Sequence, residues 1–259
     1  MLKKISLIFT IILILTTTLF PSDPFNYFVE VKNFNNKVYS EKTTRYRLTS
    51  SNEDFSLIAT GYQKIISDKI KGQKKIIDIE TGPVANPPAS GEELSPYLKD
   101  TRFLNLASPE ITGAASKFKG SPDPVKSVED YVYKHITDKT LGIPLVPAVD
   151  IYRMNRGDCT EHSVLAVALL RKLLVPARAV VGMLLTEEFK GRRNIFVYHM
   201  WAEAFVKGKW VLVDATRPGE KHLNRYIAFT YHNLKTEAPL PYLRAVSSIQ
   251  DLMVEYMGE

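Results

Sequence analysis

The amino-acid sequence predicts an α+β protein in which a strand-rich N-terminal region precedes a helical section and a second group of strands. Three observations lead to this prediction. β-branched and aromatic residues are frequent in residues 25–80, a stretch rich in proline and glycine follows at 82–96, and helix-start signals come after it. With 259 residues, of which 45% are hydrophobic, the chain can bury a core of ordinary size, in one large domain or two small ones.

The N-terminal region is expected to consist of strands. The first shows the clearest alternation, with Phe25, Tyr27 and Val29 at every second position. The expected strands cover residues 25–31, 38–49, 55–66 and 75–80. The stretch 82–96 is then a loop or linker and a candidate domain boundary.

Helices are expected in the middle of the chain. Residues 108–110, Ser-Pro-Glu, combine a capping serine, a proline suited to the first helical position and an acidic first turn, which predicts a helix to about residue 118. Residues 123–124, Asp-Pro, repeat this arrangement, and valines then recur at helical spacing up to His135. A short turn is expected at residues 150–154.

The strongest helix signal lies at residues 155–175, NRGDCTEHSVLAVALLRKLLV. Asp158 can cap this helix, Glu161 can close a capping box, and Pro176 ends it. Its apolar residues leave almost no polar face, so we expect the helix to be central and buried. Cys159, the only cysteine of the chain, falls in its first turn.

The last part of the chain predicts more strands. They are expected at residues 177–185, 195–206, 210–214 and 226–231. A polar loop is expected at 186–194, and Gly208 suits the first central position of a type II′ turn between the second and third of these strands. The tail is ambiguous, and residues 246–256 could form an amphipathic helix.

The N-terminus carries an export signal. Lys3 and Lys4 precede Ile5–Phe20, which is apolar apart from one serine and four threonines, and Pro21 follows. The run is shorter than the ~18–20 residues of a comfortable membrane span, yet no A-x-A-like cleavage site follows it, so a cleaved signal peptide and a retained anchor both stay open. In either case the lysines favour an exported body, periplasmic or anchored on the outer face of the cytoplasmic membrane.

The charge pattern argues against a nucleic-acid partner. The net charge of +6 is spread along the chain, with short clusters only at residues 69–75 and 190–193. Because no basic helix is interleaved with aromatic residues, we interpret the charge as a solvated surface, or as a weak preference for an anionic envelope or membrane face. The sequence has no phosphate-binding glycine loop and no cluster with metal-ligand spacing, so no cofactor or metal ion is expected.

Cys159 is the candidate nucleophile. At the first turn of a helix, the free backbone N–H groups and the helix dipole favour a thiolate over a thiol. The same N–H groups point to where an oxyanion would form. The alternative is an inert buried cysteine, which is common for this residue type, but the position at a capped helix start favours the reactive interpretation.

His199 is the candidate base, because it lies in the middle of a predicted strand, where an imidazole needs a reason to be. Alternation places it on one face with Trp201 and Glu203, and an even-numbered turn brings Asp214 to the same face. In the simplest register Asp214 lies opposite Glu203, so its contact with His199 requires a bulge, a slip or strong twist. Spacing alone leaves this triad open.

The other histidines have weaker claims. His162 lies three residues from Cys159 on the same helix, where a surface neighbour rarely has the geometry to take a proton from the sulfur, and we interpret it as structural or supporting. His135 is expected to be structural, beside a buried stripe. His222 and His232 lie in loop-like or terminal contexts.

Three blocks of the sequence resemble the bacterial transglutaminase-like superfamily of papain-related cysteine enzymes. GDCTEHSVLAVALLRKLLVPARAVVG (157–182) is similar to the cysteine helix and following strand of the family, and YHMWAEAFVKGKWVLVDAT (198–216) to its histidine–tryptophan and aspartate strands. PYLKDTRFLNLASPEITGAASKF (96–118) resembles, more weakly, the lead-in of envelope members. Leu174 departs from the usual glycine before the "iPAR" element, and Ala215 from the usual proline after the aspartate.

The resemblance implies a papain-like core with a cysteine helix packed on an antiparallel sheet. It matches Cys159 to the nucleophile, His199 to the base and Asp214 to the orienting acid. It implies thiol acyl transfer on a peptide, protein or cell-envelope amide substrate through a thioester, in a protease- or amidase-type hydrolase. A protein-crosslinking transglutaminase and a non-catalytic binding or scaffold module stay open as alternatives.

The expected division of the chain combines these observations. Residues 1–22 form the signal peptide or N-terminal membrane anchor, residues 23–95 the β-rich region, and residues 96–259 the transglutaminase-like catalytic domain. Through residues 5–20 the protein is expected to associate with a membrane if the segment is retained. Tyr152 and Asn155 are candidates, from position alone, for the second oxyanion donor.

Overall fold

The computed structural model describes most of the chain. The described residues are 28–84, 93–140, 145–219, 221–232, 234–235 and 251–258. The expected export segment 1–22 and the start of the expected first strand lie outside these ranges. Among the described residues, no helix is both long enough and apolar enough to cross a membrane.

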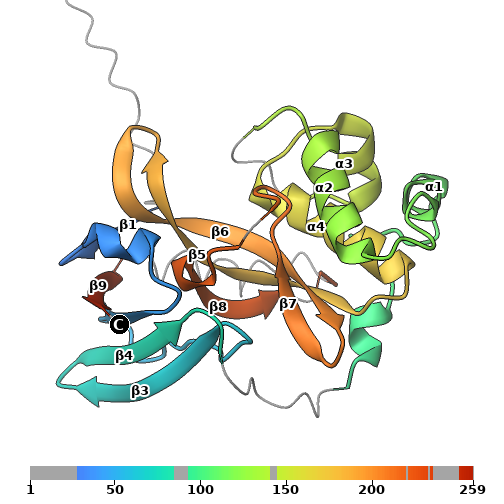
Figure 1. The fold of residues 1–259 in the computed structure, drawn as a ribbon. Coiled ribbons are helices and arrows are strands. Elements are labelled where there is room, and N and C mark those ends of the chain that lie inside the picture. The colour runs from blue at the N-terminus through green and yellow to red at the C-terminus, as the bar shows by residue number, and fades with distance from the viewer. Residues whose placement is uncertain are drawn as a thin grey trace, which may run out of the picture.

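Nine strands within the described ranges form one sheet (Figure 1). In chain order they are β1 (Phe28–Lys32), β2 (Thr44–Ser50), β3 (Gln63–Lys71), β4 (Lys74–Thr81), β5 (Ala177–Phe189), β6 (Arg192–Val206), β7 (Lys209–Val213), β8 (Tyr226–His232) and β9 (Met253–Gly258). Across the sheet the order is β3-β4-β2-β9-β1-β6-β5-β8, and β7 pairs with β6. β1 joins the two halves, because it pairs antiparallel with β6 and parallel with β9.

β9 lies between β1 and β2, although it comes from the far end of the sequence. Val254 is fully buried while its neighbours on both sides are half-buried, which fits the period of two of a strand. The tail, which the sequence left ambiguous, is therefore a strand over residues 253–258, and the amphipathic helix that residues 246–256 could form is wrong for the described part of that segment. The N-terminal region and the C-terminal segment share one sheet.

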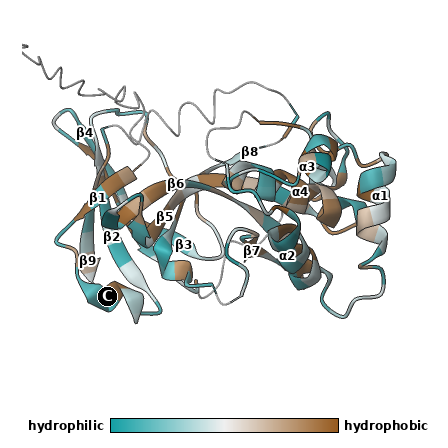
Figure 2. Cartoon of the chain, turned by 90° about the horizontal axis from the view of Figure 1, so that it is seen from above, coloured by the Kyte–Doolittle hydropathy of each residue, from teal (hydrophilic) through white to brown (hydrophobic). Residues whose placement is uncertain are grey.

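The helices gather at the end of the molecule opposite β1, β2, β4 and β9 (Figure 2). They are α1 (Pro109–Ser116), α2 (Pro124–His135), α3 (Ala148–Met154) and α4 (Cys159–Lys172), with short 3-10 turns at Asn36–Tyr39, Ser95–Leu98 and Leu223–Arg225. α4 contacts β5, β6 and each of the other three helices. Its residues from Thr160 to Arg171 are all buried, as its apolar sequence predicts.

The predicted helix starts are confirmed. The Ser108 side chain accepts a hydrogen bond from the Ile111 amide at 3.2 Å, and the Asp123 side chain accepts one from the Lys126 amide at 2.9 Å. In both helices a proline occupies the first turn, where its missing N–H costs nothing. These local signals are sufficient to position α1 and α2 along the chain.

α4 ends in a Schellman motif built on a non-glycine residue. Leu174 has a φ of 62°, its amide donates to the Arg171 carbonyl, and the Val175 amide donates to the Leu170 carbonyl. The superfamily that the sequence resembles usually has glycine at this left-handed position, because glycine adopts it without a steric penalty. The leucine side chain there is 80% exposed.

Several expected strand limits are wrong. The 38–49 strand begins only at Thr44, after a 3-10 turn, and the 55–66 strand begins at Gln63. Phe55 is buried in a loop, where its ring meets Phe229 edge-on, so burial rather than strand pairing explains the apolar residues there. The expected loop 186–194 is a hairpin that extends β5 and β6 around a two-residue turn at 190–191.

The α+β class and the strand-rich N-terminal region are confirmed. The division of the chain at residues 95 and 96 stays a prediction. What the sheet adds is continuity, since β1 pairs directly with β6.

Candidate active site

Cys159 occupies the first position of α4, and its side chain is half-buried. The helix is capped by Asp158, whose side chain accepts from the Thr160 amide at 2.9 Å, while the Glu161 side chain accepts from the Asp158 amide at 2.8 Å. The predicted capping box is therefore confirmed. At this first position the Cys159 amide has no acceptor within its helix, so it is available to a group that approaches the helix N-terminus.

Gly157 and Glu161 pack tightly before the cysteine. Gly157 has a φ of 153°, and a Cβ added there would lie 2.4 Å from the Cβ of Glu161. The Glu161 side chain is fully buried, and burial together with the charge of Asp158 raises its pKa to about 8. Glu161 is therefore mostly protonated at neutral pH, and only glycine fits at position 157 beside it.

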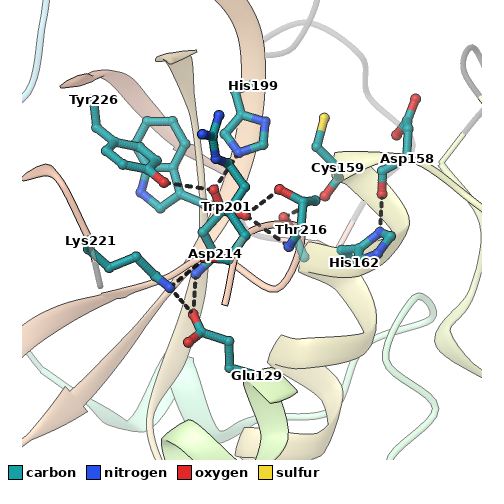
Figure 3. Close-up of polar contacts among 12 residues, drawn as sticks. Glu129, Asp158, Cys159, His162, His199, Trp201, Asp214, Thr216, Lys221 and Tyr226 are labelled. Atoms are coloured by element: carbon teal, nitrogen blue, oxygen red, sulfur yellow. Dashed lines mark hydrogen bonds and ion pairs between the residues drawn. The ribbon is translucent and has the colours of Figure 1, made fainter. Parts of the chain in front are cut away.

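His199 lies in the middle of β6, between the residues that pair with β1 and those that pair with β7. β1 pairs with residues 195–197 and β7 with residues 202–206. The imidazole is 6% exposed and lies beside the Cys159 sulfur (Figure 3). The two residues that were expected to be nucleophile and base are thus brought together from a helix start and a strand.

The turn between β6 and β7 differs from the expected type II′. Lys207 and Gly208 have φ values of 52° and 80°, so both central residues are left-handed, as in a type I′ turn. Val206 therefore pairs with Lys209. The expected register paired Lys207 with Trp210, and it is wrong by two residues. The reason is that Lys207 takes a left-handed conformation, which was expected only of the glycine.

This register carries Asp214 towards His199 without a bulge. The last pair of the hairpin is Ala202 with Val213, so Asp214 follows beside Trp201 and diagonal to His199. Nε2 of His199 and Oδ2 of Asp214 are 2.8 Å apart. Contact between these two residues is a direct result of the turn type.

The imidazole is held between Asp214 and Cys159. Because Asp214 occupies Nε2, Nδ1 is the ring nitrogen left for the Cys159 sulfur. Burial lowers the pKa of His199, but the charge and hydrogen bond of Asp214, with those of Cys159, outweigh it and raise this pKa to about 10. The ring is therefore positively charged at neutral pH, as a proton donor to a leaving group must be.

Both oxygens of Asp214 are fully engaged. Oδ1 accepts from the Thr216 amide at 3.0 Å and hydroxyl at 2.6 Å, and Oδ2 accepts from the Tyr226 hydroxyl at 2.8 Å as well as from His199. Burial raises the pKa of Asp214, but the positive charge and hydrogen bond of His199 and the two hydroxyls hold it well below its usual value. Asp214 is thus ionised wherever the protein is folded at moderate pH.

α2 holds the main chain of Asp214. The Asp214 amide donates to Glu129 Oε1 at 2.7 Å, and Lys221 Nζ lies 2.9 Å from the same oxygen (Figure 3). Burial raises the pKa of Glu129, partly offset by Lys221. The carboxylate therefore ties a helix, a strand end and a loop together next to the pair.

Sequence reasoning missed these supports. Thr216, two residues after Asp214, has a local signal, since an aspartate side chain commonly accepts from the backbone two residues on. Tyr226 and Glu129 have none, because each meets Asp214 only through tertiary folding. Their positions follow from the tertiary placement of β8 and α2.

The remaining histidines have other partners. The nitrogens of His162 bond to the Asp158 carbonyl at 2.6 Å and to Lys139 Nζ at 2.7 Å, and burial lowers its pKa to about 4. His135 stacks between aromatic rings and bonds to the Tyr152 carbonyl at 2.8 Å. These contacts agree with a structural or supporting role for His162 and a structural role for His135, and both roles stay predictions.

In the part of the chain that the structure describes, no three or more His, Cys, Asp and Glu side chains form a group that could hold a metal ion.

The second oxyanion donor stays a prediction. Asn155 has a φ of 54° at the end of α3, and its carbonyl accepts from the Thr137 and Asp138 amides. Tyr152 stacks on His135.

A family model described as the transglutaminase-like superfamily matches residues 107–215. These residues have a transglutaminase-like fold. The match includes Cys159, His199 and Asp214 and the helices α1 to α4. The comparison with curated proteins gives no match.

Solved structures are similar to this chain. A candidate cysteine protease from Cytophaga hutchinsonii aligns with a TM-score of 0.50 at 15% identity, over 84% of this chain and 84% of that chain. The periplasmic domain of TgpA from Pseudomonas aeruginosa aligns with a TM-score of 0.49 at 17% identity, over 68% of this chain and 70% of that chain. With the family match, the first likeness confirms the expected fold of a cysteine helix packed on an antiparallel sheet.

Proposed function

We propose that the protein is an exported thiol acyl-transfer enzyme that cleaves peptide or amide bonds with Cys159, His199 and Asp214. One observation supports this most strongly. The imidazole of His199 lies between the Asp214 carboxylate, 2.8 Å from Nε2, and a half-buried cysteine at a capped helix start. A nucleophile, a base and an orienting acid are the parts that such chemistry needs.

In the acylation step, the Cys159 sulfur attacks the carbonyl carbon of the substrate, and the carbonyl oxygen becomes an oxyanion. The Cys159 amide and the dipole of α4 favour this negative charge. His199 then gives the proton on Nδ1 to the leaving nitrogen, the C–N bond breaks, and a thioester and a free amine result. Asp214 keeps the ring oriented through Nε2 and stabilises its positive charge.

In the deacylation step, His199, now neutral, takes a proton from an acceptor that attacks the thioester. Water as acceptor gives an acid and regenerates the thiol, whereas an amine gives a new amide. We place hydrolysis first, because water reaches any site whose cysteine is half-buried, whereas a crosslinking transglutaminase also needs room for an amine. The superfamily that the sequence resembles admits both outcomes.

Peptides, proteins or cell-envelope amides are the proposed substrates, because the sequence of residues 3–21 predicts export. Fractionation of cells that make the full chain tests the location. Release from the periplasm would support a cleaved signal peptide, and retention with membranes would support an anchor formed by residues 5–20. Recovery in the cytoplasm would contradict export.

Alkylation of Cys159 by iodoacetamide tests the catalytic assignment. We expect His199→Ala to slow alkylation at neutral pH by about tenfold or more, because the thiolate loses its positively charged partner. His162→Ala is the matched control, since it removes another imidazole near the start of α4, and we expect its rate to stay within about twofold of wild type. Equal rates in the wild type and His199→Ala would contradict the assignment.

Incubation with peptides, with and without a primary amine, separates the candidate reactions. Product masses distinguish backbone cleavage, side-chain deamidation and amine incorporation, and Cys159→Ala gives the background. Amine incorporation without cleavage would favour the crosslinking transglutaminase. Products identical to those of Cys159→Ala across diverse peptides would favour a binding or scaffold module instead.

A further inference from the structure

The N-terminal strand region reaches the active site through Tyr62. This residue immediately precedes β3, and its side chain is 2% exposed. Its hydroxyl accepts a hydrogen bond from Trp201 Nε1 at 2.8 Å and donates one to Glu203 Oε1 at 2.7 Å. A single hydroxyl therefore holds two side chains of β6, the strand that carries His199.

Trp201 links this contact to the catalytic pair. Its ring stacks on the His199 imidazole, with centroids 6.0 Å apart and an interplanar angle of 26°. The same indole meets Tyr226 edge-on, with centroids 5.3 Å apart, and Tyr226 donates to Asp214. The indole thus lies against the imidazole and against one of the groups that hold the carboxylate (Figure 3).

One edge of the indole packs against a strand backbone. Gly182 on β5 pairs with His199, and a Cβ added to it would lie 2.7 Å from Cη2 of Trp201 and 2.0 Å from the Ile227 carbonyl oxygen. Trp201 is 1% exposed. The indole therefore sits in a fitted space in which its N–H is held by Tyr62.

Tyr62 is itself fixed by its neighbour and by charge. The Gln63 side chain forms two hydrogen bonds with the main chain of Ala228 on β8, at 2.8 and 2.9 Å. Glu203 is held from its other side by Arg178 Nε at 2.8 Å. Burial and the charge of Glu203 raise the pKa of Tyr62 well above its usual value, so the hydroxyl keeps the proton that it donates.

We propose that Tyr62 is a positioning residue of the active site, which fixes Trp201 and thereby the orientation of the His199 imidazole towards Cys159 and Asp214. The inference rests on the proposed function. It makes the β-rich region around β3 a working part of the enzyme, since removing the hydroxyl disturbs a ring that touches the base.

Two tyrosine-to-phenylalanine variants of the full chain test this role. Tyr62→Phe removes the bridging hydroxyl, and Tyr46→Phe is the matched control, because Tyr46 is fully buried in the same region and its hydroxyl donates to the Asn224 carbonyl at 3.2 Å. We expect Tyr62→Phe to lower the rate constants of Cys159 alkylation and peptide cleavage about tenfold, and Tyr46→Phe to change them less than about twofold. Equal losses in the two variants would reduce Tyr62 to a packing residue and overturn the proposal.

A spectroscopic readout keeps the test independent of the proposed reaction. The proton that His199 Nε2 donates to Asp214 is expected to give a downfield, slowly exchanging NMR signal, assigned by its absence in His199→Gln. Tyr62→Phe should broaden this signal, and Tyr46→Phe should preserve it. A sharp, unchanged signal in Tyr62→Phe would overturn the positioning role, whereas a wild type with this signal but without His199-dependent alkylation would contradict the proposed function alone.

A double-mutant cycle identifies the route of the effect. If Tyr62 acts through Trp201, then adding Tyr62→Phe to Trp201→Phe should lower the alkylation rate constant less than about twofold further, since the indole N–H is already lost. The same tenfold loss in both backgrounds would show that Tyr62 acts by another route, which would overturn the proposal.

Discussion

The charge on His199 makes the stability of the protein depend on pH within a defined window. The pKa of this group is raised from 6.5 in its ordinary state to about 10 in the folded protein. Below the ordinary value both states bind the proton, so the stabilisation is fully present. As the pH rises, the unfolded chain releases the proton first, and the stabilisation is lost progressively until the pH passes the folded value.

One proton retained by the folded state corresponds to a slope of about 1.4 kcal/mol per pH unit within this window. Between about pH 7 and about pH 9, the contribution of His199 should therefore fall by roughly 2.7 kcal/mol. The imidazole is 6% exposed, so solvent screens little of this interaction. Urea unfolding of the wild type and of His199→Gln at several pH values measures it as the difference between the two unfolding free energies.

The difference between the two unfolding free energies is more informative than the pH dependence of either protein, because other groups titrate in the same range. Glu161, for example, is present in both proteins and cancels. Asp214→Asn serves as the second variant, since it removes the carboxylate that holds the imidazolium. The difference between its unfolding free energy and that of His199→Gln should not change with pH. A flat difference between wild type and His199→Gln would refute the charged pair and with it the positive imidazole in the proposed mechanism.

Three further predictions concern neighbouring residues. Tyr226→Phe removes a buried hydrogen bond to the charged Asp214 and should lower the unfolding free energy by about 1.5–3 kcal/mol, measured by urea unfolding; a loss below about 0.5 kcal/mol would contradict the bond. Leu174→Gly should raise the midpoint of thermal unfolding, with a gain of about 0.5–1 kcal/mol, because glycine relieves the left-handed strain, and a loss would show that the leucine side chain matters more. The wild type should lose unfolding free energy as pH rises from 4.5 through about 8, because Glu161 ionises more easily in the unfolded chain. Glu161→Gln should lose less over this range, since an amide does not ionise, and an unchanged pH profile of unfolding free energy would refute the raised pKa.

Local chemistry made part of the site predictable from sequence. The capping box of Asp158 and Glu161 needs only residues three positions apart, and it was enough to place Cys159 at a helix start. Strand alternation placed His199 and Asp214 on one face, and this parity is unaffected by a two-residue change of register. The identity of the turn was not predictable in the same way, because Lys207 can adopt a left-handed conformation only at a cost that the rest of the hairpin offsets.

Long-range contacts were beyond the reach of the sequence. Tyr62 meets Trp201, and Glu129 meets Asp214, across large separations in the chain, and no periodicity or spacing connects them. β9 was ambiguous for a related reason, since a short segment of mixed polarity acquires its period of two only when it is placed between β1 and β2. The resemblance to the superfamily covers the helices and the central strands, where its motifs lie, and says little about these additions.

The position of β9 has a consequence for how the chain reaches its native state. β2 and β4 are synthesised early, yet the strand that separates β2 from β1 comes from residues 253–258. Until those residues are made, β1 and β2 cannot take their final places in the sheet, and the hydrogen-bonding edges that β9 covers stay open. Non-local pairing of this kind slows folding, and the open edges are exposed to wrong pairing for as long as β9 is missing.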